Sequence, residues 1–188
     1  MTDGIPLRIA EPAGRYRRSL RRYRISRETK CPVPDGYGYC NASADIGDVT
    51  SADPCGDDWP HDDPRWPAAC AACGSAFTDQ DRWQRNDDMI YQLPGAPEFV
   101  VRGGLGASAP PGTMIRAGWY DEYALRPGES WLVALPDGGE WITTQAATGG
   151  GYWEVTGVPP AISVSPSIWH NQPHGWHGWF RDGMLVDA

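Results

Sequence analysis

Glycine and proline recur so closely along this chain that long helices have little room to form. The 188 residues include 23 Gly and 18 Pro, and both residues destabilise the interior of a helix. From residue 113 onward, short β-branched or aromatic runs alternate with turn residues, as in TMIRAGWY, SWLVALP and AISVS. PDGG after Leu135 and RDG after Phe180 are typical of hairpin turns. We therefore expect a mainly β protein, with little helix and a small antiparallel sheet or barrel in its C-terminal part.

Composition divides the chain into four segments. Residues 1–30 form a basic N-terminal arm, 31–94 a Cys-rich module, 95–112 a Gly- and Pro-rich linker, and 113–188 a β-rich domain. The module shows neither helical nor alternating periodicity over residues 31–75, so it needs an external staple. The run TDQDRWQRNDDMIYQL opens with Thr78 three residues before Asp81, a pattern that predicts one short helix ended by Pro94.

Charge is distributed unevenly. The first thirty residues hold nine cationic and three acidic side chains, a net +6, so the remainder carries −14 of the total −8. An acidic body repels nucleic acid, which restricts any such binding to the N-terminal arm. Tyr16, Leu20 and Tyr23 fall at helical spacing within RYRRSLRRYR. The arm either grips nucleic acid or an acidic partner, or, as we favour, lies as a short helix or strand against the protein's own acidic body.

Targeting signals are not evident. No apolar run approaches the roughly 20 residues that span a bilayer, and MTDGIPLRIA lacks a signal-peptide core. The sequence thus predicts a cytoplasmic protein without membrane contact. Five cysteines in a reducing compartment are poorly explained by disulfides, so metal binding is the better use for them.

The cysteines suggest a zinc site. Cys70 and Cys73 form CAACG, whose two-residue spacing lets two thiolates converge on one tetrahedral cation. Cys31 and Cys40 upstream complete a set of four thiolates, and such a closed site holds structural rather than catalytic Zn²⁺.

Other uses of the cysteines stay open. Cys55 or His61 could replace one of the four ligands. A redox CAAC motif would need a helix start and a βαβ pattern, and neither is evident. Buried cysteines without a ligand are the remaining alternative.

A second group of chemically active side chains lies near the C-terminus, in ISVSPSIWHNQPHGWHGWF. Ser167 follows the predicted strand AISVS, and His177 begins the predicted returning strand HGWF. A serine hydroxyl needs a base within hydrogen-bond reach to act as a nucleophile at neutral pH. The pattern indicates Ser167 as nucleophile and His177 as general base, with Asp121, Asp137 or Glu140 as candidates to orient the imidazole.

Two alternatives compete with this pair. His170, His174 and His177 stand at positions i, i+4 and i+7 and could bind a catalytic metal, but Pro173 interrupts a helix between them. Equally, the serine could cap a turn and the histidines could be polar tips on a Trp-rich wall, because no G-x-S-x-G elbow is present.

The residues also resemble a known family. PPAISVSPSI through HGWFRDGMLV, the middle portion around Trp131–Pro136, and the cysteine-bearing runs KCPVPDGYGYC and DPRWPAACAACGSAFTDQDRW are similar to the domain of unknown function 6527 family, especially its phage members. The similarity covers most of the chain from about Lys30. Trp179 departs from the family pattern, because it stands between Gly178 and Phe180 and puts the spacing after the histidine in question.

The resemblance implies a phage-encoded protein of the host cytoplasm. A peptidase role has been proposed for relatives encoded beside ubiquitin-like conjugation genes, and it would assign catalysis to Ser167 and His177. The expectation is thus a peptidase-like hydrolase that acts on an unidentified protein or peptide and carries structural zinc. The alternative is a non-enzymatic phage accessory or host-interaction protein, in which the zinc module and the Trp-rich sheet form a binding surface.

Overall fold

The computed structural model describes residues 4–24, 31, 39–50, 59–105, 108–123, 129–144, 153–170 and 175–188. The protein is mainly β, as the glycine and proline content predicts, and among the strand pairs whose register is described all but one are antiparallel. Within the described residues no helix is long and apolar enough to cross a membrane. Two compact units are present, one of Met1–Ala13 with Ile90–Ala188 and one of Gly14–Met89.

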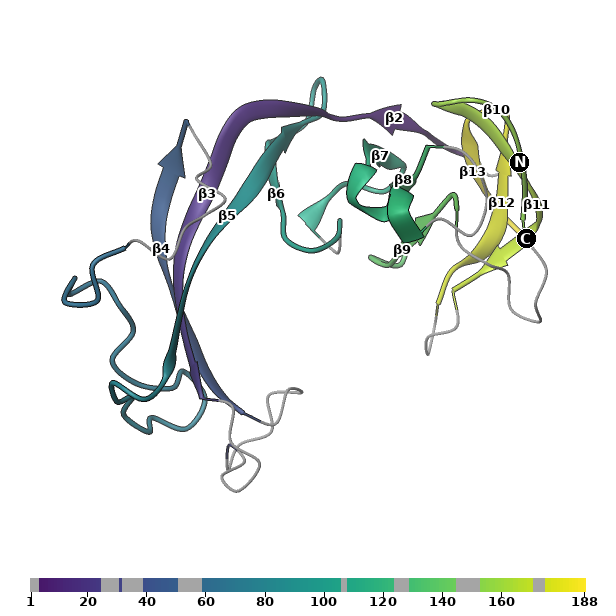
Figure 1. Cartoon of the computed structure of the whole chain (residues 1–188). Coiled ribbons are helices and arrows are strands. Elements are labelled where there is room, and N and C mark those ends of the chain that lie inside the picture. The colour runs from purple at the N-terminus through teal and green to yellow at the C-terminus, as the bar shows by residue number, and fades with distance from the viewer. Residues whose placement is uncertain are drawn as a thin grey trace. The chain divides into compact units, whose positions relative to one another are not determined.

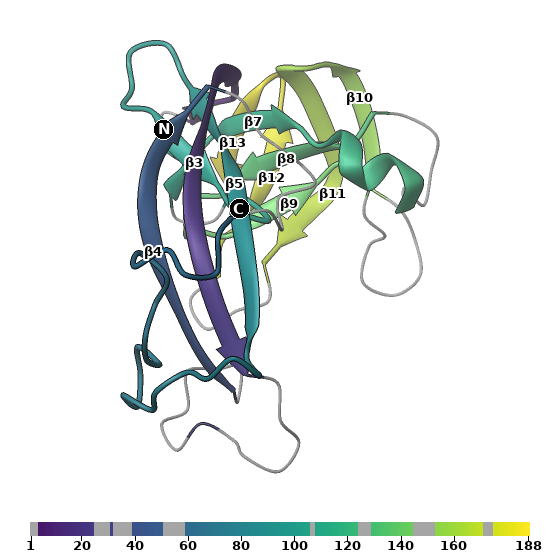
Figure 2. The ribbon, with the colours of Figure 1, turned by 60° about the vertical axis from the view of Figure 1, so that its left-hand side comes forward.

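The unit Gly14–Met89 is built on long strands. β3 (Glu11–Arg24) lies between β4 (Cys40–Val49) and β5 (Arg82–Gln92), side by side as Figure 2 shows. β3 and β4 pair antiparallel from Tyr16 opposite Val49 to Arg24 opposite Cys40. The register brings Arg17 opposite Asp48, and an opposite-charge pair of this kind stabilises the pairing of the two strands.

The short helix expected from the Thr78–Asp81 pattern is wrong, and the basic arm, expected as a short helix or strand, is a strand. RYRRSLRRYR belongs to strand β3, and the segment after Asp81 is strand β5 rather than a short helix. The carboxylate of Asp81 does accept the N–H of Thr78 at 2.6 Å, as a capping residue would, but it also binds Arg24 of β3. Pairing with a neighbouring strand therefore decides the conformation against the local signal.

The other unit contains two sheets, and Figure 1 labels all of their strands except β1. One has the order β1-β13-β12-β11-β10 and the other β2-β7-β8-β9. The 3-10 segment η2 (Gly118–Tyr123) also belongs to this unit. The strands of these two sheets are β1 (Ile5–Pro6), β2 (Arg8–Ile9), β7 (Thr113–Arg116), β8 (Trp131–Ala134), β9 (Glu140–Ile142), β10 (Glu154–Val158), β11 (Ala161–Trp169), β12 (His177–Arg181) and β13 (Met184–Asp187). β6 (Phe99–Val101) pairs with β5 in the sheet of order β4-β3-β5-β6.

One hydrophobic cluster joins the two sheets of this unit. Met114 and Val133 come from one sheet, and Ile162, Val164 and Phe180 come from the other, all buried. Because side chains alternate along a strand, the neighbours of these residues on β11 and β12 point to the opposite face. That face carries the serine and histidine residues singled out above.

Both expected hairpin turns are present. β8 and β9 pair around PDGG, with Ala134 opposite Glu140. β12 and β13 pair with Arg181 opposite Met184, which leaves Asp182 and Gly183 as a two-residue loop, both at positive φ. Asp-Gly is a favoured sequence for a turn with two left-handed residues.

Candidate metal centre and serine-histidine pair

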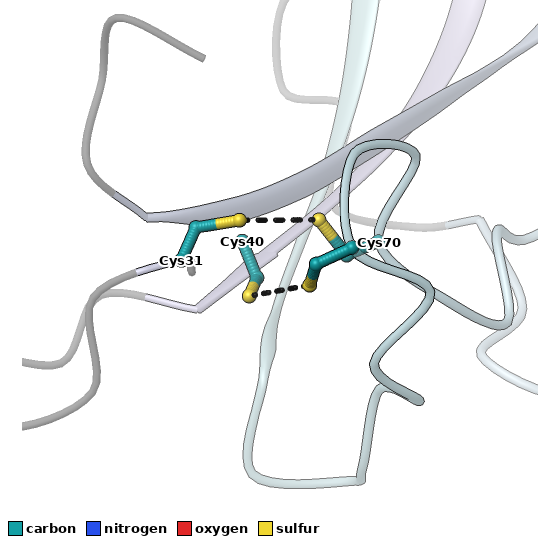
Figure 3. A group of neighbouring side chains, drawn as sticks. Cys31, Cys40 and Cys70 are labelled. Carbon is teal, nitrogen blue, oxygen red and sulfur yellow. Dashed lines mark hydrogen bonds between the residues drawn. The ribbon is translucent and has the colours of Figure 1, made fainter. Parts of the chain in front are cut away.

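Four cysteine sulfurs converge in the unit Gly14–Met89. The ligand atoms of Cys31, Cys40, Cys70 and Cys73 all lie within 4.8 Å of one another. The Sγ atoms of Cys31 and Cys70 are 4.0 Å apart, and those of Cys40 and Cys73 are 3.7 Å apart. Figure 3 shows the sulfurs of Cys31, Cys40 and Cys70 turned toward a common centre. All four cysteines named from the sequence as ligands are therefore brought together.

A tight turn presents Cys70 and Cys73. The N–H of Gly74 donates to the carbonyl of Cys70, and the N–H of Cys70 donates to the carbonyl of Ser75, both at 2.9 Å. Gly74 has φ +73, a conformation that glycine adopts at little cost. Ala69 and Ala76 close the turn with an antiparallel bridge. The CAACG spacing thus folds as a knuckle that directs both thiols to the same side.

The sulfur separations fit a tetrahedral metal ion. A Zn–S bond of about 2.3 Å gives tetrahedral edges of about 3.8 Å between ligand sulfurs, close to the measured 4.0 and 3.7 Å. A disulfide needs sulfurs about 2.05 Å apart, and all four cysteines are free. Three of them are buried and Cys73 is half-buried, so the cluster could hold a metal ion shielded from solvent.

The thiols of this cluster differ in acidity. Burial raises the pKa of Cys40 to about 12. Hydrogen bonding with Ser75 lowers the pKa of Cys73 to about 6. Four neighbouring thiolates would repel one another, and a bound cation offsets that repulsion.

The two alternative ligands lie elsewhere or cannot be placed. The ring of His61 stacks on Trp83 with centroids 4.9 Å apart, and His61 does not belong to the four-sulfur cluster. Cys55 lies outside the described residues.

Ser167 and His177 form a hydrogen bond on neighbouring strands of the other unit. Ser167 Oγ lies 3.1 Å from His177 Nε2. The pairing of Ile168 with Gly178 and of Trp169 with His177 sets the end of the β11–β12 ladder, and the register shifts between Val164 and Ile168. Such a bulge re-aims side chains, and Ser167 stands within it. The two residues predicted as nucleophile and base are therefore in contact.

The carboxylates considered for orienting His177 contact other groups. Asp137 Oδ2 lies 2.6 Å from His170 Nδ1 and accepts the N–H of Trp176 at 2.7 Å. Glu140 accepts the N–H of Leu105, and Asp121 pairs with Arg116. Burial opposes ionisation of Asp137, but hydrogen bonds from Trp176, His170 and Gly139 hold its pKa below the usual range.

The proposed metal site of three histidines is not supported by the contacts of the two histidines that are described. His170 is bonded to Asp137 and His177 to Ser167. His174 lies outside the described residues. The two described histidines are therefore engaged with different partners.

Four arginines of the N-terminal arm, which include Arg15, pair with carboxylates of their own unit. Arg17 bonds to Asp48 on β4, Arg18 forms a two-pronged pair with Asp87 on β5, and Arg24 forms another with Asp81. Arg22 is buried, and its guanidinium carbon lies 3.5 Å from the ring centroid of Trp83. The positive charge of β3 is thus largely neutralised within the protein.

One feature near Ser167 was not expected from the sequence. A pocket opens on the face of β10, β11 and β12 that carries Ser163 and Ser165. The alternation of serine with buried apolar residues in AISVS was the available signal, because it places small side chains in a row on one face of a strand. The residues on either side of this row of serines come from β10 and β12. The register of those strands with β11 could not be predicted from the local sequence.

Comparison with known proteins adds no relative to this description: no family model, curated protein or solved structure matches the chain.

Proposed function

We propose that the protein is a hydrolase, peptidase-like in its chemistry, with Ser167 as nucleophile and His177 as general base. The separation of 3.1 Å between Ser167 Oγ and His177 Nε2 carries this proposal. It lies within the range in which an imidazole can accept the proton of an attacking hydroxyl. The sequence resemblance to the domain of unknown function 6527 family implies the same two residues, on the peptidase role proposed for relatives.

The reaction would proceed in two steps. Ser167 Oγ bonds to the carbonyl carbon of a peptide while its proton passes to His177 Nε2. The protonated ring then gives that proton to the departing amine as the C–N bond breaks, leaving an ester on Ser167. In the second step a water attacks the ester carbonyl, His177 takes the water's proton, and that proton returns to Ser167 Oγ as the acid is released.

The ring of Trp179 packs beside the imidazole of His177, with 6.2 Å between the two ring centroids.

Labelling by a fluorophosphonate tests the nucleophile. We expect the probe to label wild type and Ser43→Ala, an exposed serine in the other unit, but not Ser167→Ala. His177→Ala should slow labelling by about 10²-fold or more, since general-base assistance is typically worth 10²–10⁴. Labelling that survives Ser167→Ala would remove Ser167 as nucleophile. A wild type that neither takes up the probe nor hydrolyses activated esters would contradict the hydrolase proposal.

We propose further that the four-cysteine cluster binds Zn²⁺ as a structural ion. Its support is the sulfur separations and the all-thiolate donor set, which Zn²⁺ prefers and which leaves no open coordination position. The residues that would hold the ion are Cys31, Cys40, Cys70 and Cys73. The ion would join the start of β4 to the Cys70–Cys73 turn.

Metal content tests the ligand set. Wild type and Cys55→Ser should each contain about one zinc per chain, whereas Cys70→Ser with Cys73→Ser should contain none. Equal zinc in wild type and the double variant would contradict the site. Loss of zinc in Cys55→Ser would show a different ligand set.

A non-enzymatic binding role is the second candidate. The observation that favours it is the side chain of Trp169, which is 67% exposed at the end of β11. A large exposed aromatic residue is typical of an anchor for a protein partner. If this role is the true one, Trp169→Ala should weaken partner binding while Ser167→Ala leaves it unchanged.

A further inference from the structure

The pocket beside the serine-histidine pair has a floor of small side chains and walls of larger ones. It measures about 360 Å³, within the range of ligand pockets. Its side chains come from three adjacent strands, since β11 lies between β10 and β12. The side chains that shape it are Glu154 and Thr156 on β10, Ser163 and Ser165 on β11, and Trp179 and Arg181 on β12.

Strand register arranges five of these six side chains in two rows, and Trp179 stands beside the register shift between β11 and β12. Glu154 pairs with Ser165, and Thr156 pairs with Ser163. Val164 pairs with Phe180, so in an antiparallel ladder Arg181 falls opposite Ser163. One row therefore places Glu154 at one wall, and the next row places Arg181 at the other, with the Asp182 carboxylate bonded to Ser163 Oγ at 3.3 Å in that second row. The rows are two residues apart, about 6.6 Å along a strand.

The two charged walls are available to a ligand. Within the described parts of the chain, neither Glu154 nor Arg181 forms an ion pair, and both are exposed. The guanidinium of Arg181 lies 4.7 Å from the ring centroid of Trp179, which supports it from one side. The hydroxyl oxygen of Ser163 already accepts the backbone N–H of Asp182 at 2.9 Å. The hydroxyls of Thr156 and Ser165 border the pocket between the two charges.

We propose that this pocket binds an extended peptide that carries a basic and an acidic side chain two residues apart. Side chains i and i+2 of an extended chain point to the same face about 6.6 Å apart, so a peptide that runs along β11 places one of them over each row. Glu154 on β10 and Arg181 on β12 then lie on opposite sides of the peptide, each about one strand spacing of 4.8 Å from β11. The basic side chain faces Glu154 and the acidic side chain faces Arg181. The hydroxyls of Ser165 and Thr156 are placed to bond the peptide backbone, and Trp179 covers its apolar atoms.

This recognition goes beyond the proposed hydrolysis and does not depend on it. Ser165 and Trp179 lie two residues from Ser167 and His177 respectively, so a peptide in the pocket would extend toward the hydrogen-bonded pair. Binding, however, uses Glu154 and Arg181 and requires no chemistry at Ser167. The two proposals can therefore fail separately.

Titration of the Ser167→Ala protein with matched synthetic peptides tests the inference without turnover. The probes are capped heptapeptides with the central sequence Lys-Ser-Glu, together with Gln-Ser-Glu, Lys-Ser-Gln and a Lys-Ser-Ser-Glu octapeptide that breaks the i, i+2 spacing. We expect Lys-Ser-Glu to bind about fivefold more tightly than each single-charge probe, the upper range for an exposed ion pair. The octapeptide should bind like a single-charge probe.

Substitutions identify the side chains responsible. Arg181→Gln should abolish the preference for Glu over Gln and keep the preference for Lys, while Glu154→Gln should do the reverse. Arg82→Gln, an exposed arginine of the other unit, is the matched control and should change neither preference. Equal binding of all four probes, absence of binding at millimolar peptide, or preferences that survive both substitutions would each overturn the inference. Loss of binding with intact fluorophosphonate labelling would separate this failure from failure of the hydrolase proposal.

Discussion

The carboxylate of Asp137 holds the imidazole of His170, with 2.6 Å between Oδ2 and Nδ1. The same oxygen accepts the backbone N–H of Trp176, and the other carboxylate oxygen accepts that of Gly139. Asp137 therefore joins the β8–β9 turn to the end of β11 and to the residue just before His177. Asp137 therefore positions the start of β12 and does not orient the ring of His177.

Removing this carboxylate should destabilise its unit. Asp137→Ala leaves the N–H groups of Trp176 and Gly139 without their acceptor, which costs about 2 kcal/mol of unfolding free energy. Urea unfolding measures the loss. Asp62→Ala, an exposed acid in the other unit, should change the free energy by less than about 0.5 kcal/mol. Equal stability of Asp137→Ala and wild type would show that these hydrogen bonds contribute nothing.

The same group predicts a loss of stability in acid. Burial disfavours its ionised form, but the hydrogen bonds from Trp176, His170 and Gly139 outweigh burial and lower the pKa of Asp137 in the folded state. A lowered folded pKa stabilises the protein above the unfolded pKa, and that stabilisation is lost as pH falls through the folded pKa. The unfolding free energy of wild type should therefore fall below about pH 4 more steeply than that of Asp137→Asn. Parallel pH profiles for the two proteins would contradict this.

A buried and an exposed ion pair on β3 provide a matched comparison. The side chain of Asp81, paired with Arg24, is 2% exposed, whereas that of Asp48, paired with Arg15 and Arg17, is 31% exposed. Asp81→Asn should cost about 3 kcal/mol because it leaves Arg24 partly buried without its counter-charge. Asp48→Asn should cost less than about 1 kcal/mol. Thermal unfolding of both variants measures the difference, and a larger loss for Asp48→Asn would show that burial does not govern these pairs.

The sequence predicts those features that depend on local chemistry. The Asp182–Gly183 turn follows from residues that tolerate positive φ, and the Cys70–Cys73 knuckle follows from a two-residue spacing closed by glycine. Ser167 and His177 could be paired because one short loop joins two strand-like runs. Each of these predictions needed only neighbours in the chain.

Features that depend on distant pairing were wrong or absent in the sequence analysis. β5 reads locally as a helix with Thr78 and Asp81 at its start, yet Asp81 binds Arg24, 57 residues away. The pocket between Glu154 and Arg181 depends on the registers of β10 with β11 and of β11 with β12. Sequence spacing alone does not contain those registers.

The β12–β13 turn should be sensitive to its glycine. Gly183 has φ +78, a conformation that costs a residue with a side chain about 1–2 kcal/mol. A Cβ at this position would also lie 3.1 Å from the carbonyl oxygen of Pro160. Gly183→Ala should therefore lower the unfolding free energy by about 2 kcal/mol, measured in urea. Gly95→Ala is the control for backbone strain alone, because Gly95 has φ +79 and open space around its Cβ position. If both variants lose the same unfolding free energy, the close contact with Pro160 does not contribute to the effect of Gly183→Ala.

Removal of metal should affect one unit and spare the other. On the zinc proposal, the ion joins Cys31 and the start of β4 to the Cys70–Cys73 turn, so a chelator removes a cross-link that the loop-rich segment cannot replace with apolar burial. Hydrogen exchange should show lost protection at Cys70 and Gly74, whose N–H groups are bonded within the turn. Amides of the β11–β12 ladder, which lie in the other compact unit, should keep their protection, and added Zn²⁺ should restore the turn. Unchanged exchange at Cys70 and Gly74 in chelated protein shown to contain no metal would mean that the four sulfurs hold their positions without an ion.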